Sequence, residues 1–233
     1  MKISKNTLAI LKNYRDLNSN ILINEGSILK TLTPAKNVMS TASVEETFPV
    51  EFGLWDLTSF LGTVSLFDDP DFDFHDKYVN ITGSNGSTVK YFYSEPSLLT
   101  VPTKDVKMPE SVVNIELKED TFNELKKAAS VLNLSDFSVC STDGASINAI
   151  LSDNKNVTSN TYSLDIGYNE GGNIFNFNFK IDNLRIIPGT YELSFAEKIV
   201  CEFTNKNLDL NYWVALESTS SFTSKVGSNI GVS

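Results

Sequence analysis

The sequence repeats itself in a fixed order, and this repeat limits the possible folds more than any other feature. Similar residues recur at an offset of 114, and a second block recurs at an offset of 119. The matched sets are Ile3, Thr7, Leu8, Leu11, Lys12 and Leu17 with Leu117, Thr121, Phe122, Leu125, Lys126 and Val131, and Lys36–Ser40 with Lys155–Ser159. A shared order of this kind indicates two copies of one domain. We therefore expect domains at residues 1–94 and 111–222.

The segment between the two copies differs in composition from both of them. It contains Pro96, Pro102 and Pro109 among scattered Lys, Asp and Ser residues. Proline cannot continue a helix or donate to a sheet, so this composition favours an extended connector over residues 95–110. At the other end, the Ser/Thr/Gly-rich stretch Ser218–Ser233 has little to bury, and residues 223–233 are predicted to be a disordered tail.

Most of the chain has the alternating, β-branched and aromatic pattern of strands, with Asn, Asp, Gly and Ser at the turns. The predicted strands are Ser19–Ile23, Tyr78–Thr82, Val89–Tyr93, Phe137–Cys140, Thr161–Ile166, Ile174–Phe179, Tyr191–Phe195, Ile199–Phe203 and Tyr212–Glu217. Helical spacing of apolar residues predicts four helices. These are Lys5–Leu17 with Ser4 as N-cap, Leu54–Phe67, Glu119–Asn133 and Asp182–Ile187. The mixture predicts an α+β fold with two helices in each domain.

Charge is distributed unevenly along the chain. The 233 residues carry a net charge of −10, which argues against a simple basic DNA-binding domain, because counterion release needs a Lys/Arg surface. The segments Lys2–Leu17, Leu54–Phe67, Lys118–Leu134 and Lys180–Ile187 together carry +3, so the rest carries −13. Solvated helix faces explain any one of these segments, but they explain the asymmetry less well.

The sequence offers no recognisable catalytic constellation. His75 is the single histidine, and there is no G-x-S-x-G, phosphate-binding loop or G-x-G-x-x-G. Cys140 and Cys201 lie in apolar runs without a basic neighbour, so we expect buried free thiols in a reducing cytoplasm. The sequence therefore offers no nucleophile with its base and no cofactor-binding motif. A carboxylate pair for acid/base catalysis stays open among the 29 acidic residues, but nothing singles one out.

The acidic stretch Asp68–Asp76 has two interpretations. As a strand it places four possible cation ligands on one face. They are Asp69, Asp71, Asp73 and His75. The EF-hand pattern is not met, because Phe74 and Asn80 stand where Gly and Glu are required. We favour the other interpretation, a solvated loop or edge strand with Phe72 and Phe74 packing inward.

Four segments resemble the DNA polymerase sliding clamps of T-even-like bacteriophages. The similar segments are Met1–Tyr14, Trp55–Leu66, Asn173–Phe177 continuing to Pro188–Tyr191, and Asn211–Glu217. They are collinear and extend from residue 1 to about residue 222. The resemblance implies the clamp fold, in which each domain has two helices backed by antiparallel sheets and three subunits close a six-domain ring around duplex DNA.

The resemblance also implies a function and partners. Such clamps do no covalent chemistry and tether the replicative DNA polymerase to its template. An ATP-dependent clamp loader opens the ring, and in T-even-like phages the clamp also supports late transcription. The implied location is the cytoplasm of the infected bacterial host.

Two sets of site residues follow from the resemblance. The DNA-facing inner surface is expected to contain Lys5, Lys12, Arg15, Lys126, Lys127 and Arg185, with Lys2, Lys118 and Lys180 as further candidates at helix ends. The pocket for partner peptides is expected beside the connector. Its candidates are Leu98, Leu99, Val101, Tyr212, Trp213 and Val214, although Trp213 fits a core position equally well.

Two other functions remain open from the sequence. A β-rich phage structural protein of a tail or coat fits the strands and the acidity, but it does not account for the repeated helices or for both arginines lying on them. A hydrolase with an acidic site is favoured only by the stretch Asp68–Asp76.

Overall fold

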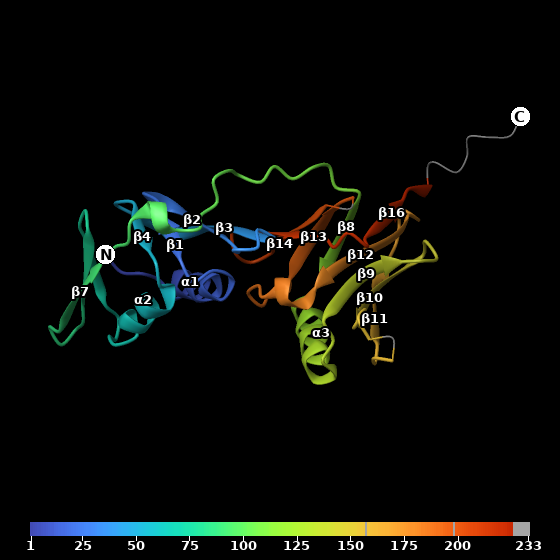
Figure 1. Cartoon of the computed structure of the whole chain (residues 1–233), viewed down its shortest axis with the longest axis horizontal. Coiled ribbons are helices and arrows are strands. Elements are labelled where there is room, and N and C mark those ends of the chain that lie inside the picture. The colour runs from blue at the N-terminus through green and yellow to red at the C-terminus, as the bar shows by residue number, and fades with distance from the viewer. Residues whose placement is uncertain (157, 198, 226–233) are drawn as a thin grey trace, which may run out of the picture. The chain divides into compact units, whose positions relative to one another are not determined.

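The computed structural model describes residues 1–156, 158–197 and 199–225, and the chain divides into two compact units. Unit 1 consists of Met1–Asp105 together with Arg185–Ile187 and Leu208–Tyr212. Unit 2 consists of Val106–Leu184, Pro188–Asn207 and the residues from Trp213 onward. Figure 1 shows that both units combine helices with antiparallel strands.

Unit 1 contains two helices and three groups of strands. The two-stranded pair is β1–β4, β2 pairs with β3, and the three-stranded sheet has the order β5-β6-β7. The elements are α1 (Lys5–Leu17), β1 (Ile21–Ile23), β2 (Gly26–Leu32), β3 (Val38–Phe48), β4 (Phe52–Leu54), α2 (Leu57–Val64), β5 (Asp71–Phe74), β6 (Tyr78–Thr82) and β7 (Thr88–Phe92).

Helix α1 forms where the periodicity predicts it. Ser4 Oγ accepts from the Thr7 amide at 3.2 Å, which confirms the predicted N-cap. Ile10, Leu11 and Tyr14 are almost fully buried on the face turned to the strands. At the start of the helix, the buried carboxylate of Glu46 on β3 accepts from both Ser4 N and Thr7 Oγ1. The N-terminus of α1 is thereby fixed to the sheet by an anion where the helix dipole favours one.

Aromatic side chains make the core between β4 and the three-stranded sheet. Phe52 lies 5.2 Å from Phe74 and 5.1 Å from Tyr93, measured between ring centroids. Phe72 is 2% exposed, and Phe74 is partly buried. These contacts confirm the second interpretation of the acidic stretch, in which the phenylalanines of β5 face inward and the aspartates face water.

The predicted connector is extended apart from one short turn. A 3₁₀ helix, η1 (Pro96–Leu98), is followed by residues without regular structure up to β8 (Val113–Leu117). Near its start, the connector lies against β4, where Ser94 N donates to Gly53 O at 2.9 Å. A Cβ on Gly53 would lie 2.6 Å from Ser94 O and 2.7 Å from Leu99 Cδ1, so only glycine permits this approach.

Unit 2 contains one α-helix, one 3₁₀ helix and two groups of strands. One sheet has the order β11-β10-β9-β12-β16, and in the other β13 pairs with β8 and β14. Besides β8, the elements are α3 (Glu119–Leu132), β9 (Asp136–Ser141), β10 (Ser146–Ser152), β11 (Tyr162–Tyr168), β12 (Ile174–Lys180), η2 (Ile181–Leu184), β13 (Tyr191–Ala196), β14 (Val200–Asn205) and β16 (Ser221–Thr223). Strand β15 (Leu210–Ala215) begins in unit 1 and ends in unit 2.

Phenylalanines of three strands fill the core of unit 2. Phe177 on β12 stacks on Phe195 of β13 with ring centroids 4.3 Å apart, and Phe179 meets Phe203 of β14 edge-on at 5.9 Å. All four side chains are fully buried. Because β12 belongs to one sheet and β13 and β14 to the other, these pairs hold the two sheets face to face. Both predicted free cysteines, Cys140 and Cys201, are buried in this unit.

A buried ion pair joins β9 to β12. Asp136, whose side chain is 3% exposed, accepts a hydrogen bond from Lys180 Nζ. Burial by itself raises the pKa of Asp136, but hydrogen bonds from Lys180 and from the Asn154 amide hold that pKa below its ordinary value. The carboxylate therefore stabilises the folded unit in its charged form.

The structure confirms the predicted α+β class and corrects three details. The fourth predicted helix is the 3₁₀ helix η2, which ends before Arg185 and the turn at Pro188. The second helix is shorter than predicted, because Asp56 caps it by accepting from Ser59 N at 3.0 Å. The start of the predicted disordered tail is ordered, since β16 pairs with β12. Residues 226–233 of that tail lie outside the described part of the chain.

Replacing Asp136 with Asn should lower the free energy of unfolding by about 2 kcal/mol at neutral pH, because Lys180, which is partly exposed, loses its anion. A lowered carboxyl pKa stabilises the fold above the ordinary value of 3.8 and stops doing so as the pH falls through the lowered value. The difference between Asp136→Asn and wild type should therefore shrink below about pH 4. Urea unfolding at several pH values measures this, with the exposed Glu110→Gln as control. A pH-independent difference would contradict the account.

Candidate functional site

Helix α1 exposes cations on the face opposite its core. Lys5 and Lys12 are exposed, and no acidic residue precedes them in the helix. Arg15 is half-buried and pairs with Asp16 at 2.8 Å in an exposed contact that salt screens strongly. Two lysines at the surface and one arginine shared with a carboxylate give this helix a mildly positive outer face.

The structure brings Arg185 to this helix, which sequence spacing alone could not show. Asn13 Nδ2 donates to the Arg185 carbonyl at 2.8 Å. The hydroxyl of Tyr212 donates to Asn13 Oδ1 at 2.7 Å and accepts from Ile187 N at 3.3 Å. The short segment Arg185–Ile187 is thus fixed to α1 in unit 1, with the side chain of Arg185 exposed. Neither Asn13 nor Tyr212 was predicted to act in this way.

The two predicted cations of α3 have different environments. Lys127 is exposed, whereas Lys126 is half-buried with Nζ 5.2 Å from the centre of the Phe122 ring. Burial lowers the pKa of Lys126. The exposed face of α3 also carries carboxylates, including Glu124, which accepts from Tyr162 OH. Lys127 is therefore the better-placed cation of this helix.

Two of the three further candidate lysines, Lys2 and Lys180, form ion pairs with carboxylates. Lys2 Nζ lies 2.9 Å from Asp69 Oδ2 and 3.4 Å from Asp71 Oδ2. Lys180 is paired with Asp136. The third, Lys118, occupies the N-cap position of α3 without a side-chain cap. Helix α2 carries no basic residue, so among the α-helices of the described residues the cations lie on α1 and α3.

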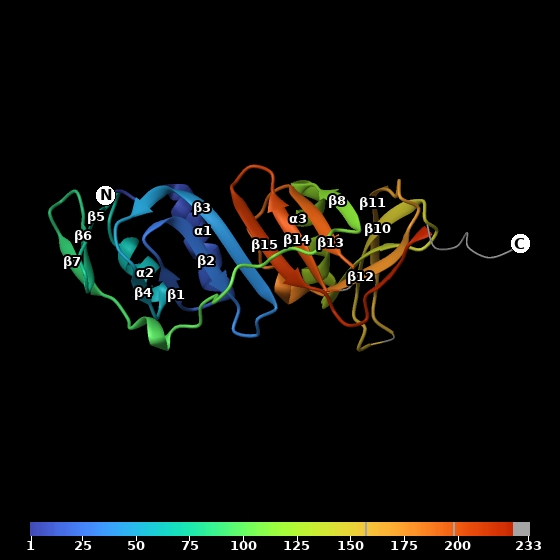
Figure 2. The same ribbon diagram turned by 90° about the horizontal axis from the view of Figure 1, so that it is seen from above.

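The connector presents the predicted pocket residues unequally. Leu98 is 63% exposed at the end of η1. Leu99 and Val101 are half-buried, and Leu99 lies in the space left by Gly53. Figure 2 shows η1 beside β1 and β4. Of the three aliphatic residues, Leu98 is the one most available to a partner.

The structure corrects the predicted pocket on the last long strand. Tyr212 and Val214 are fully buried, so neither can line an open pocket in the chain as it stands. Side chains alternate along a strand, and Trp213 therefore lies on the opposite face of β15, where it is half-buried. Its indole Nε1 is buried and finds no acceptor among the described residues. Of these three residues only Trp213 stays a pocket candidate.

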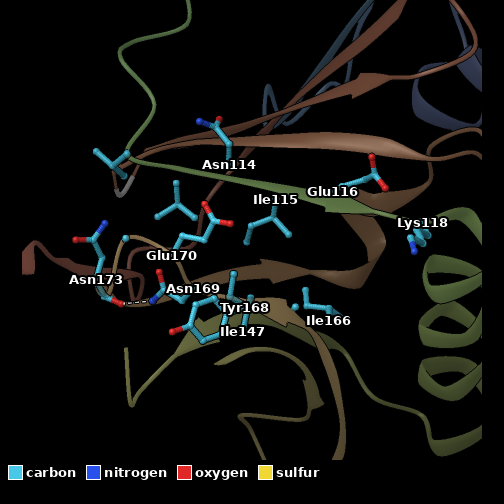
Figure 3. A pocket seen from close by; sticks show the side chains of 14 residues that line it. Asn114, Ile115, Glu116, Lys118, Ile147, Ile166, Tyr168, Asn169, Glu170 and Asn173 are labelled. Carbon is cyan, nitrogen blue, oxygen red and sulfur yellow. Dashed lines mark hydrogen bonds between the residues drawn. The ribbon is translucent and has the colours of Figure 1, made fainter. Parts of the chain in front are cut away.

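Several strands pair on one side only within the described chain, and two of them end in a highly exposed aromatic residue. They are β7 of unit 1, with Phe92 64% exposed, and β11 of unit 2, with Tyr168 74% exposed. A cavity of about 490 Å³ lies between β11 and β8. In Figure 3, Ile115 points from β8 toward Ile147 and Ile166, whereas Asn114 points away. The cavity is lined by polar as well as apolar side chains, and the exposed edge of β11 beside it is suited to receive another strand.

The remaining acidic and apolar features point to no chemistry. His75 Nε2 lies 2.9 Å from Asp73 Oδ2, and Asp69 and Asp71 lie near Lys2 Nζ. Across residues 1–156, 158–197 and 199–225 no three His, Cys, Asp or Glu side chains are grouped to hold a metal ion. Within the same ranges no helix is long and apolar enough to cross a membrane.

Comparisons with known proteins identify the class of protein that has this fold. PCNA of A. fulgidus, solved with the C-terminal region of FEN-1 bound to it, superposes on this chain with a TM-score of 0.67. The two chains are 13% identical, and the superposition covers 90% of this chain and 94% of that one. Residues 114–218 match the family described as gp45 sliding clamp, C terminal. The fold is that of the sliding clamps.

Sequence similarity then identifies the branch of that class. The chain is 29% identical to the sliding clamp of Vibrio phage KVP40, over 94% of this chain and 100% of that protein. It is 28% identical to the sliding clamp of Escherichia phage RB69, over 94% of this chain and 98% of that protein. The chain is thus similar to phage sliding clamps over nearly its whole length, as the resemblance implied. Sliding clamps are replication processivity factors without enzymatic activity, which confirms the expectation that the chain is not an enzyme.

The buried position of Tyr212 gives a stability prediction. Tyr212→Phe leaves Asn13 Oδ1 without its donor and Ile187 N without its acceptor, so the free energy of unfolding should fall by about 1–3 kcal/mol. The partly exposed Tyr78→Phe is the matched control and should change it by less than about 0.5 kcal/mol. Chemical denaturation measures both. Equal free energies of unfolding for the two variants would show that the hydrogen bonds of the Tyr212 hydroxyl do not stabilise the fold.

Proposed function

We propose that the protein is a sliding clamp that encircles duplex DNA as a homotrimer and tethers the replicative DNA polymerase. The observation that carries the proposal is the match to phage sliding clamps over 94% of the chain. Residues 1–94 and 111–222 act as the two clamp domains of each subunit, with residues 95–110 as the connector and residues 223–233 as a tail. A β-rich tail or coat protein is disfavoured by the same match.

The inner surface of the ring consists of Lys5, Lys12, Arg15, Lys126, Lys127 and Arg185. Lysines that are long and exposed contact phosphates without reading bases, so the ring is held in place but is free to move along the duplex. The large negative charge of the remaining surface repels DNA from the outside. Retention on DNA then depends mainly on closure of the ring, and weak phosphate contacts add to it.

Ring closure uses the edges of β7 and β11. Pairing β7 of one subunit with β11 of the next satisfies two edges that are open in the single chain. The two strands end in exposed Phe92 and Tyr168, which a partner would cover. Because each subunit offers one edge of each kind, the contact is head-to-tail and can close into a ring.

Partner proteins dock at the connector through a short peptide with apolar anchors. Leu98, Leu99 and Val101 form the receiving surface, with Leu98 most exposed. A fold neighbour was solved with the C-terminal region of FEN-1 bound to it, which supports peptide binding by this fold. The partners are the polymerase, an ATP-dependent clamp loader and late-transcription factors, in the cytoplasm of the infected host.

The edge contact predicts how single substitutions change assembly. Phe92→Glu and Tyr168→Glu should each shift the protein from trimer to monomer, because a charge would be buried at the contact. Both side chains are exposed in the single chain, so the fold should be retained. Native mass spectrometry across a range of concentrations measures the shift. The control is Ile199→Glu, at a residue 67% exposed at the turn between β13 and β14. If all three variants stay trimeric, β7 and β11 are not the subunit contact.

The inner-surface assignment predicts a selective effect of charge removal. Neutralising Lys5, Lys12 and Lys127 together to Gln should shorten the time that loaded clamps remain on DNA, most clearly at low salt, where phosphate contacts count most. Neutralising the exposed Lys36, Lys104 and Lys107 to Gln removes the same charge elsewhere on the surface and should leave the residence time on DNA unchanged. Single-molecule residence times measure both. An equal effect of the two triple variants would count against an inner surface on α1 and α3.

A further inference from the structure

Two buried asparagines hold the connector at Thr100. Asn18, which follows α1, is 3% exposed, and Asn20, which precedes β1, is 8% exposed. Asn18 Nδ2 donates to Thr100 O at 3.0 Å and to Leu32 O at 2.9 Å. Asn20 Oδ1 accepts from Thr100 N at 2.9 Å. Both backbone groups of Thr100 are therefore bonded as they would be beside a neighbouring strand.

The two asparagines are themselves fixed to the end of α1. Asn20 N donates to Asn18 Oδ1 at 3.1 Å, and Asn18 N donates to Tyr14 O at 2.8 Å. Tyr14 is fully buried. Breaking any one of these bonds would leave a buried polar group without a partner, which is the costly way to lose a hydrogen bond. The pair of asparagines is a rigid element and not a chance surface contact.

Other contacts along the connector are weaker or less specific. Lys30 Nζ lies 2.6 Å from Asp105 Oδ1, but the aspartate side chain is 77% exposed and the pair is open to screening. Leu99 lies against Gly53 through apolar contact. Thr100 stands directly after Leu99 and before Val101, so the bonds to its backbone set the direction of both neighbours.

We propose that Asn18 and Asn20 form a clasp that fixes the connector in one conformation and so presents Leu98 and Val101 to partner peptides already ordered. This inference rests on the proposed binding of partner peptides at the connector. With the clasp closed, a peptide meets an ordered surface, and the entropy of ordering the connector has been lost before binding. Opening the clasp moves that cost into the binding step. The asparagines are positioning residues, and neither needs to touch the peptide.

The test compares two variants that each remove one hold on the connector. The probe is a fluorescent peptide of the C-terminus of the polymerase encoded with this clamp, titrated into the full-length protein. Asn20→Ala should raise the Kd about 5- to 10-fold, mainly through a faster off-rate. Asp105→Ala removes the exposed Lys30 contact and should change the Kd less than about 2-fold. Asn20→Asp keeps the acceptor for Thr100 N and should recover most of the affinity.

Hydrogen exchange separates positioning from a general loss of structure. In Asn20→Ala the Thr100 amide should exchange faster, whereas core amides of β6 and β9 should keep their protection. Should Asn20→Ala fail to fold, Thr100→Pro deletes the same donor and leaves both asparagines in place. Leu99 already has the extended backbone (ψ 148°) that precedes proline, so the same loss of affinity is expected.

The outcomes distinguish this inference from the proposed function. Unchanged peptide affinity in Asn20→Ala, with faster exchange at Thr100, would overturn the clasp and leave the clamp function intact. An equal loss in Asn20→Ala and Asp105→Ala would also overturn it. Failure of the wild-type protein to bind the peptide at all would instead overturn the proposed docking at the connector.

Discussion

Electrostatic repulsion between an acidic protein and DNA is the constraint on which the rest of this structure depends. A chain with a net charge of −10 cannot hold a polyanion by affinity alone. In unit 1, Lys5 and Lys12 are exposed on α1, and Asn13 and Tyr212 fix the segment of the exposed Arg185 beside that helix. In unit 2 the exposed cation of α3 is Lys127. The proposed function therefore assigns retention on DNA mainly to closure of a ring.

Closure requires subunits that keep their shape while their edges stay free to pair. The aromatic cores supply that rigidity, with Phe177 stacked on Phe195 in unit 2 and Phe52 against Phe74 in unit 1. The edges β7 and β11 remain open within the described chain. The connector is also held rigidly, by Gly53 at one point and by the clasp of Asn18 and Asn20 at another. Rigid units with a few open edges suit a protein that must assemble, open and close again.

Local patterns in the sequence were enough to predict part of this structure. The periodicity of α1, the Ser4 cap and the strand Tyr78–Thr82 were found correctly, because helical spacing and alternation are local properties. The sequence analysis did not predict the long strand β3, because its polar residues Ser40, Thr41 and Glu46 interrupt the alternation of apolar and polar residues that is typical of a strand. Ser40 and Glu46 are buried because they bond to partners far along the chain, which no local pattern reveals.

The candidate site was predicted less completely for the same reason. Lys5 and Lys12 follow from the polar face of α1, but the contact of Arg185 with that helix joins residues more than 170 positions apart. Tyr212 and Val214 were wrongly assigned to a pocket, because neighbouring residues on a strand face opposite ways and the sequence does not say which face is buried. The hold of Asn18 and Asn20 on Thr100 had no signal in the sequence.

The central claim is that the protein holds DNA by encircling it. The most direct measurement loads the clamp with its loader onto a nicked circular plasmid, washes in high salt, and then cuts the plasmid once with a restriction enzyme. The account predicts that clamps survive the wash on circular DNA and are lost within minutes of linearisation, because they slide off the ends. Clamps that leave the circle in high salt, or remain on the linear DNA with free ends, would contradict it.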